Sequence, residues 1–357
     1  MLRRNIISRS ERVTAQSKSG IAVIIVNYGT ADLTIDGVES ILARQHGGHP
    51  VEVHVVDNAS PGDDASRLAQ THEERGWGDL VTLWLERKNH GFGRGNNVVL
   101  KALAERETPP EYFFLLNPDA ALENEALATL ADFMDSRPQV QAAGARIERP
   151  NGSPVTAAFR FPGAASEFAS TVSFGPVTRL FDRYQVAMPA DLPRQMVDWV
   201  SGAAVMFRFS AAQKAGFFDP DFFLYYEETE LMWRLHAQGG EVWFLPEARV
   251  GHEAGAATGM QGGRHRSKAQ PAYWYDSWRL YHVKTRGVAA ARWTALSKFV
   301  GAGLNVVFQR LRGREPDLPL NFRKDFTAHV LKPLFGGRPD LARPDGKTPK
   351  AEWLQRQ

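Results

Sequence analysis

The sequence predicts an α/β fold in which a mostly parallel central sheet is flanked by helices. Two observations support this prediction. First, four short segments, at residues 21–27, 51–57, 81–86 and 112–117, have the composition of strands, and residues 21–27 have the nearly continuous hydrophobicity of a strand buried on both faces of a parallel sheet. Second, helix-like segments lie between them, and strand–helix–strand units of this length form right-handed crossovers between parallel strands.

The predicted helices are bounded by residues that stop helices or form turns. The first occupies about residues 31–44 and is ended by the glycines and proline of residues 47–50. A turn at residues 58–62 precedes a polar helix that ends near Arg75. A third helix, at about residues 95–106, follows a loop rich in glycine and asparagine.

The regular alternation stops after about Pro150. Residues 151–195 are rich in Pro, Gly, Ser and Phe, and they predict loops or short irregular strands. The remaining predicted elements are a strand with small residues at its centre (197–208), a helix (227–238), a strand (241–246), two helices (270–286 and 288–312) and, beyond Arg314, a loosely held basic tail.

Composition indicates an ordinary globular protein. Of the 357 residues, 43% are hydrophobic, 11% aromatic and 23% charged, which excludes wholesale disorder, a collagen helix and a long coiled coil. The chain has no cysteine, so disulfides, thiolate zinc sites, iron–sulfur clusters and cysteine nucleophiles are excluded. No uncharged apolar run approaches the roughly 18 residues that a membrane-spanning helix needs.

Positive charge is concentrated at the two ends of the chain. Residues 1–20 carry five basic and one acidic side chain, and residues 284–357 carry fifteen basic and six acidic ones. Since the net charge of the whole chain is only +3, the body between these ends is acidic. The pI near 9.1 therefore does not indicate a nucleic-acid partner. We interpret residues 1–20 as a disordered basic arm, although an organellar transit peptide has a similar composition.

Polar side chains follow each of the four predicted strands. They are Asn27-Tyr28, Asp57-Asn58, the segment 89–97, and Asn117-Pro118-Asp119. In a parallel sheet these positions meet at the carboxyl edge, where α/β proteins bind their ligands. Turn formation is the alternative explanation, and it suits Asn58 well.

The segment GFGRGNN at residues 91–97 is a weak dinucleotide-binding signal. It follows the third strand instead of the first, and it lacks the Gly-x-Gly-x-x-Gly spacing. Backbone N–H groups at the start of a helix nevertheless suit a phosphate of any kind.

Asp119 and His252 are candidate metal ligands. Asp119 offers one carboxylate to a hard cation such as Mg²⁺ or Mn²⁺, which completes its shell with water and phosphate oxygens. His252, in a glycine-flanked loop, could supply a second ligand. The structural alternatives are a turn or helix cap for Asp119 and a hydrogen-bonded surface position for His252.

An acidic cluster begins the predicted helix at residues 227–238. On a helix, Glu227 and Glu230 share a face and Glu230 lies one turn before Arg234, whereas Glu228 points elsewhere. One of these carboxylates could accept a proton from an alcohol. A helix dipole also favours acidic residues at this end, and the local sequence does not choose between the two explanations.

Seven segments, in this order, resemble inverting glycosyltransferase family 2, which has the GT-A fold, and in particular its bacterial rhamnosyltransferase-like branch. They are VIIVNYGT (23–30), VVDNAS (55–60), NHGFGRGNN (89–97), LLNPDA (115–120), WVSGAAVMF (199–207), FFLYYEETELMWRL (222–235) and VGHEAG (250–255). The resemblance implies a GT-A glycosyltransferase domain at residues 21–286, followed by a basic helical extension and tail at residues 287–357.

The resemblance also implies a role for particular residues. It assigns donor binding to Asn27, Tyr28, Asp57, Asn58, Asn89, Gly91, Phe92, Gly95, Asn96, Asn117 and Asp119, with Asp57 at the nucleoside base. It assigns the sugar and acceptor site to Trp199, Ser201, Gly202 and Ala203. Asp119 and His252 correspond to ligands of Mg²⁺ or Mn²⁺. Glu228 corresponds to the general base, with Glu227 as the alternative.

Two residues depart from the wider family's pattern. Asn117 stands where many members have the first Asp of Asp-x-Asp, which puts the affinity for metal in question. Glu228 stands where Asp is commoner, so the proposed base is longer by one methylene group and the acceptor must sit farther from the helix, or Glu227 must serve instead.

The implied reaction is inverting transfer of a sugar from a nucleotide diphosphate to a hydroxyl of a glycan or lipid-linked saccharide, in the cytoplasm, for cell-surface polysaccharide. We favour dTDP-L-rhamnose as the donor, with UDP-galactose and UDP-N-acetylglucosamine as alternatives. The rival classes are a nucleotidyltransferase, a glycoside hydrolase and a non-catalytic nucleotide-sugar-binding protein. A nucleotidyltransferase should have a basic loop after the first strand, and residues 27–30 have no Lys or Arg.

Residues 288–312 support two interpretations. Apolar positions at helical spacing are interleaved with Arg292, Lys298, Arg310 and Arg312, which suits a helix lying in an anionic membrane interface. An amphipathic helix packed on the catalytic domain fits equally well. The sequence does not indicate an oligomeric state.

Overall fold

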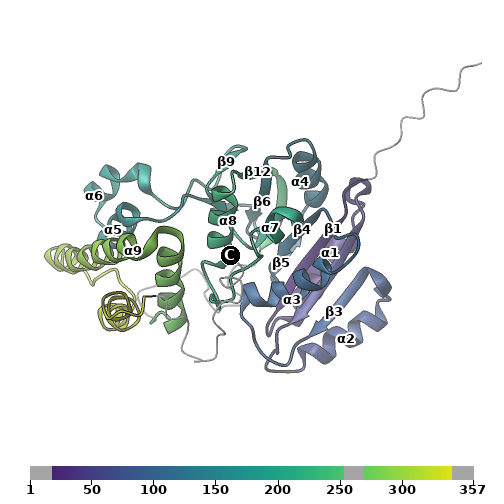
Figure 1. Cartoon of the computed structure of the whole chain (residues 1–357), viewed down its shortest axis with the longest axis horizontal. Helices are drawn as coiled ribbons and strands as arrows, with labels where there is room; N and C mark the ends of the chain where they lie inside the picture. Colours follow the sequence, from purple (N-terminus) through teal and green to yellow (C-terminus); the bar gives the residue numbers. More distant parts are fainter. Residues whose placement is uncertain (1–17, 253–268, 340–357) are drawn as a thin grey trace, which may run out of the picture.

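The computed structural model describes residues 18–252 and 269–339. Figure 1 shows a large sheet with flanking helices at one end of the molecule and a helical region around α9 at the other. Most of the predicted basic arm, the end of the VGHEAG segment and residues 340–357 of the predicted tail lie outside the described residues.

The four predicted N-terminal strands are present and parallel. β1 (Ile21–Asn27) lies between β2 (Val51–Asp57) and β4 (Tyr112–Leu116), and β3 (Val81–Leu85) pairs with the outer side of β2. All of β1 and β4 is buried, as expected of strands covered on both faces.

The other half of the sheet makes it mixed. β11 (Ala204–Arg208) is antiparallel to both β4 and β6 (Val140–Glu148), β12 (Glu241–His252) is parallel to β6, and β5 (Ala120–Leu122) forms the edge. The sequence pattern does not predict β6, because its centre is alanine and glycine instead of β-branched residues. Four short strands complete the pairing: β7 (Pro154–Val155) with β6, β9 (Gln195–Val197) with β12, and β8 (Ala158–Phe159) with β10 (Trp199–Val200).

Helices cover the sheet. They are α1 (Ala31–Leu42), α2 (Asp64–Glu74), α3 (Phe92–Ala104), α4 (Ala126–Asp135), α7 (Phe209–Lys214) and α8 (Glu227–Ala237). The third helix starts at Phe92, earlier than predicted, so the glycine-rich segment forms its first turn and is not a loop. The prediction of a single strand at residues 197–208 is wrong, because this segment is divided among β9, β10 and β11.

Two predictions of irregular structure are wrong in part. Residues 151–195 contain the expected short strands, β7 and β8, but also α5 (Ala164–Val172) and α6 (Gly175–Leu180). The described part of the predicted loose tail forms α10 (Phe322–Phe326), a π-helical turn (Thr327–Leu331) and α11 (Lys332–Phe335). Phe326, Val330 and Leu334 have no exposed surface, so tertiary burial holds a segment whose composition resembles that of a tail.

The two predicted C-terminal helices form one long element. α9 (Ala272–Leu311) bends at Gly287, whose φ of 80° interrupts the helix at the predicted junction. A buried cluster joins residues on both sides of this bend: Tyr275 and Trp278 pack with Ala291, Ala295 and Phe326. None of the helices within the described ranges combines the length and apolar character needed to cross a bilayer.

Candidate active site

Asn27, at the end of β1, organises the carboxyl edge of the sheet. The register sets it level with Asp57, and its amide nitrogen donates to Asp57 Oδ1 at 2.9 Å, Ser60 Oγ at 3.2 Å and Asp64 Oδ1 at 3.1 Å. Its side-chain oxygen accepts from Thr30 and Thr34. Since Asn27 is fully buried and its polar atoms have protein partners, it holds the edge together and does not face a ligand.

Asp57 is held in place from two sides. Its Oδ1 accepts from Asn27 and from Ser60 Oγ, the latter at 2.6 Å, and only 2% of the residue is exposed. Because so little of Asp57 is exposed, a nucleoside base bound at this edge would have to approach it closely to make contact.

Asn58 and Asn89 shape the next loop. Asn58 Nδ2 donates to Asn89 Oδ1 and to the Gly91 carbonyl, both at 3.1 Å, and its Oδ1 accepts from the His90 N–H. Asn89 Oδ1 also accepts from the Gly91 N–H at 2.8 Å. These bonds fix the turn that leads into α3.

Only glycine fits at position 91. Its φ is 76°, and a Cβ there would overlap the carbonyl oxygen of Phe223, which accepts from the Phe92 N–H at 2.9 Å. Gly95 packs closely on Val26. The start of α3 is thereby held against both β1 and the segment before α8.

Asn96 and Asn97 are buried within α3. Asn96 Nδ2 donates to the Phe92 carbonyl, so the amide is turned along the helix. Asn97 was not singled out by the sequence, yet its Nδ2 donates to the Phe218 carbonyl and its Oδ1 accepts from the Phe218 N–H. The sequence signal that could have identified Asn97 is its position as a polar residue on the apolar face of α3.

A cavity of about 170 Å³ lies at this edge. It is lined by Val26, Tyr28, Asn58, Asn89, Gly91, Phe92, Asn117, Pro118, Phe223 and Leu224. Six of the predicted donor residues therefore surround one cavity, whereas Asn27, Asp57, Gly95, Asn96 and Asp119 do not line it. Sequence reasoning missed Phe223 and Leu224, whose signal was their position just before the acidic cluster.

The sheet brings Asp119 and His252 together across 133 residues of sequence. β12 extends to His252 and pairs it with Ala120 of β5, so His252 lies on a strand and not in the predicted loop. His252 Nε2 is 2.9 Å from Asp119 Oδ1 and 3.3 Å from Asn117 Nδ2. A carboxylate oxygen and an imidazole nitrogen in contact, with 14% of the His252 side chain exposed, form a donor set that fits a divalent cation.

Residues 199–203 connect this pair of side chains to α8. The Ala203 carbonyl accepts from the Asn117 N–H at 2.9 Å, and a Cβ at Gly202 would lie 3.5 Å from the Glu228 carboxyl group. Ser201 Oγ accepts from the Ala203 N–H at 3.3 Å. Trp199 stacks on Phe159 with ring centroids 4.1 Å apart, and its Nε1 donates to the Arg160 carbonyl at 3.0 Å.

Glu227 and Glu228 occupy different environments. Glu227 is 1% exposed, packs on Gly93 of α3, and leaves its Oε2 without a hydrogen-bond partner. Glu228 is partly exposed and lies beside Gly202. Burial raises the pKa of both carboxyl groups, and the Glu228 charge raises the pKa of Glu227 further.

The backbone before α8 is strained. Tyr225 and Tyr226 have φ values of 72° and 71°, a left-handed conformation that non-glycine residues seldom adopt. Two residues of α9 hold this segment, because Ser277 Oγ donates to the Leu224 carbonyl and Lys284 bridges Asp219 and Asp221 at 2.7 Å. The start of α8 is therefore set by tertiary contacts and not by local preference.

Comparison with known proteins gives the family. Residues 22–193 match the family model described as glycosyl transferase family 2, and residues 112–308, more than half of the chain, match glycosyl transferase family group 2. The chain belongs to glycosyltransferase family 2.

Two curated relatives of this glycosyltransferase are rhamnosyltransferases. The N-acetylglucosaminyl-diphospho-decaprenol L-rhamnosyltransferase of Mycobacterium tuberculosis is 26% identical over 227 residues, which is 60% of this chain and 71% of the relative. Rhamnosyltransferase WbbL of Escherichia coli K12 is 23% identical over 236 residues, or 66% of this chain and 83% of the relative. The chain is thus similar to the rhamnosyltransferase-like branch.

A solved structure confirms the GT-A fold. The structure of GalNAc-T7 with UDP, GalNAc and Mn²⁺ superposes with a TM-score of 0.53 at 13% identity, and the match covers 88% of this chain and 58% of that one. At this identity the likeness concerns the fold alone.

Glu230 and Arg234, which the sequence places one helical turn apart, form an ion pair within α8 of the glycosyltransferase. Arg234 Nε donates to Glu230 Oε1 at 2.8 Å, and its Nη2 donates to Glu230 Oε2 at 2.7 Å. Arg234 also donates to the carbonyls of Ala215 and Phe217. Glu230 therefore has a structural partner, which leaves Glu227 and Glu228 as the acidic residues available for chemistry in this helix turn.

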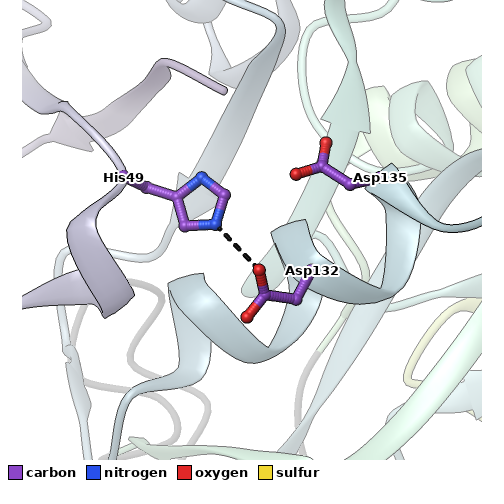
Figure 2. A group of neighbouring side chains, drawn as sticks. All are labelled: His49, Asp132 and Asp135. Carbon is purple, nitrogen blue, oxygen red and sulfur yellow. Dashed lines mark hydrogen bonds and ion pairs between the residues drawn. The ribbon is translucent and has the colours of Figure 1, made fainter. Parts of the chain in front are cut away.

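A second cluster, formed by His49, Asp132 and Asp135, has a structural role. Figure 2 shows His49 pointing at Asp132, 3.2 Å away, with Asp135 beside them. Three ligand atoms this close could in principle hold a cation. Here Lys18 already pairs with Asp132, and Ser19 and Tyr112 both donate to Asp135, so the group fastens the start of β1 to α4.

Proposed function

We propose that this glycosyltransferase transfers L-rhamnose from dTDP-L-rhamnose, with inversion, to a hydroxyl of a glycan or lipid-linked saccharide in cell-surface polysaccharide biosynthesis. The donor follows the names of the relatives in M. tuberculosis and E. coli. The first of these names a lipid-linked acceptor, and we infer that this chain also works in the cytoplasm beside a membrane that holds its acceptor.

One observation carries the mechanism. Residues 202 and 203 contact Glu228 on one side and the backbone of Asn117 on the other, two residues before Asp119. A sugar nucleotide seated over this segment would place its diphosphate near Asp119 and its anomeric carbon toward Glu228. That is the arrangement an in-line displacement requires.

Asp119 and His252 would hold a divalent cation, Mg²⁺ or Mn²⁺. When bound, the cation offsets negative charge that develops on the leaving nucleoside diphosphate. Asn117 contributes an amide where many relatives have a carboxylate, so the protein charge facing the cation is smaller, and we expect weaker binding of the free metal than in an Asp-x-Asp site.

Glu228 acts as the general base. Its carboxylate accepts the proton of the acceptor hydroxyl while that oxygen attacks the anomeric carbon from the face opposite the leaving group. Burial and the adjacent Glu228 charge raise the pKa of Glu227 well above the ordinary carboxyl value, which disfavours its ionised form. This favours Glu228, the partly exposed residue of the pair, as the base.

The test combines binding with product analysis. The full chain is incubated with dTDP-L-rhamnose, UDP-galactose or UDP-N-acetylglucosamine, each with Mg²⁺ or Mn²⁺, and stabilisation against heat is measured. NMR of the product then gives the anomeric configuration. We expect stabilisation by dTDP-L-rhamnose and an inverted product. Stabilisation by a UDP-sugar alone would reassign the donor, and a retained configuration would overturn the mechanism.

The same assay separates the rival classes. A non-catalytic binding protein would be stabilised by the donor and release neither nucleotide nor product. A nucleotidyltransferase would consume a nucleoside triphosphate and a sugar phosphate. A glycoside hydrolase would cleave a glycan without any nucleotide.

A further inference from the structure

The second half of α9 is apolar on two opposite sides. One side, which includes Ala291, Ala295 and Ala302, is buried against the rest of the molecule, and α5 is its main neighbour. The opposite side carries Trp293, Leu296, Val300, Val307 and Leu311, which are 41% to 79% exposed. Their spacing of three, four or seven residues places them in one row along the helix. We call this row the outer apolar row of α9.

The outer apolar row borders a groove. A cavity of about 470 Å³ opens between α9 and the α5–α6 region, and it is lined by Trp293, Leu296 and Val300 together with Ala164, Phe168 and Phe181. Leu180 at the end of α6 is 77% exposed. Figure 1 places α5, α6 and this part of α9 at the end of the molecule farthest from α2 and β3. An apolar surface of this extent is unusual on a soluble protein unless something covers it.

The charge around this surface indicates what covers it. After the Gly287 bend, residues 287–314 contain five Lys and Arg residues and no Asp or Glu. Arg310, Arg312 and Arg314 are exposed at the end of the row. Lys298 is not available to a partner, because it is buried and bonds Glu167 Oε2 at 2.5 Å, which corrects its place among the membrane-facing cations of the sequence analysis.

We propose that the outer apolar row of α9, with the adjoining groove, inserts into the interface of an anionic lipid bilayer. Apolar side chains flanked by cations, on a helix that lies along the surface instead of spanning, match the two requirements of interfacial binding. A second copy of the chain fits less well, since a symmetric contact would bring the same cations together, and residues 287–314 have no acidic side chain to pair them. The inference rests on the proposed function only in that a lipid-linked acceptor gives the contact a purpose.

The experiment measures sedimentation of the full chain with vesicles, without donor or acceptor. Vesicles of phosphatidylcholine alone are compared with vesicles containing an equal part of phosphatidylglycerol. We expect binding to the anionic vesicles that weakens as salt is added. The Arg310→Gln and Arg312→Gln double variant should bind them several-fold more weakly.

The decisive variant is Trp293→Ser with Val300→Ser. Removing two exposed apolar side chains should weaken partitioning about tenfold or more. The matched control is Leu80→Ser with Met196→Ser, which removes two equally exposed apolar side chains elsewhere and should bind like the natural chain. Unfolding curves of both variants check that the fold is kept.

Three results would overturn the proposal. The first is that the natural chain does not sediment with anionic vesicles. The second is that the Trp293/Val300 variant binds these vesicles as well as its control does. The third is a dimer, detected by light scattering, that this variant converts to a monomer, which would assign the surface to a second copy of the chain. Transfer from donor to a water-soluble acceptor should be equal in both variants. If the natural chain shows no transfer to this acceptor, the proposed function is contradicted. The result of the vesicle experiment does not depend on that outcome.

Discussion

Glu227 and Glu228 are adjacent in sequence but differ in access to the site. Helix geometry turns successive side chains about 100° apart, so only one of them can face residues 201–203. Sequence reasoning left both as candidates because it had no information on which face of α8 is covered. The contact of Gly93 with Glu227 and of Gly202 with Glu228 supports Glu228 as the base.

Exchanging each carboxyl for an amide should separate the two roles. We expect Glu228→Gln to lower the transfer rate roughly 10²- to 10⁴-fold, because the amide cannot accept a proton, while donor binding is unchanged. Glu227→Gln resembles the protonated residue and should keep most activity. Single-turnover rates and donor titrations of the two variants are the measurement; an active Glu228→Gln enzyme would reassign the base.

The raised pKa of Glu228 predicts how the rate depends on pH. A general base works only when it is ionised, so transfer should be lost as pH falls through a pKa above the ordinary carboxyl value of 4.5. The acidic limb of the kcat/KM profile reports this pKa in the free enzyme. A limb at or below the ordinary value would contradict the assignment.

At the scale of elements, the start of α3 depends on a close approach of backbone to backbone. Gly91 combines a left-handed φ with contact to the Phe223 carbonyl, whereas Gly76 has a φ of 61° and open space around it. We expect Gly91→Ala to cost more than the ~1–2 kcal/mol of the backbone conformation, which is all that Gly76→Ala should cost. Urea unfolding of the two variants isolates the cost of the contact, and equal losses would show that the approach is not tight.

The α5–α9 contact contains a buried ion pair that local sequence did not indicate. Glu167 bonds Lys298 and also accepts from Trp278 Nε1 at 2.9 Å. Its pKa is lowered: although burial alone would raise it, the charge and hydrogen bond of Lys298, with the nearby His282 imidazole, outweigh that effect. Its stabilising contribution is present above the unfolded carboxyl pKa and is lost as pH falls toward the lower folded value.

Breaking this pair should be more harmful than replacing it. Glu167→Gln leaves Lys298 buried without a counter-charge, and we expect a loss of about 3–5 kcal/mol in the free energy of unfolding. The double variant Glu167→Leu with Lys298→Met should lose much less, because it leaves no buried charge. Denaturant unfolding at neutral pH compares the two, and similar losses would show that the charge is not the cause.

At the scale of the whole molecule, the region after the Gly287 bend supports the residues before it. Trp278 and Tyr275 are fully buried, and their neighbours include Lys298 and Phe326. The first half of α9 in turn holds the segment that leads into α8. Stability of the C-terminal region is therefore coupled to the position of Glu228.

Removing residues 287–357 should weaken the catalytic domain. The deletion exposes Tyr275 and Trp278 and leaves Glu167 without Lys298, so we expect a lower unfolding temperature and loss of transfer to a water-soluble acceptor. Removing only residues 340–357 takes away none of these contacts and serves as the control. Equal unfolding temperatures for the two truncated chains would show that residues 21–286 are independent.

Local sequence was sufficient for the four parallel strands, for the polar residues at their carboxyl ends and for the Glu230–Arg234 pair, because each depends on periodicity or spacing within a few turns. It was not sufficient for the contact of Asp119 with His252, the partner of Lys298, or the helices α5, α10 and α11. These depend on which distant segments pack together, and burial can order a Pro-rich or Gly-rich segment whose own preferences are weak. Short sequence segments therefore determine which polar residues follow the strands. The folding of the whole sheet determines which of these side chains come into contact.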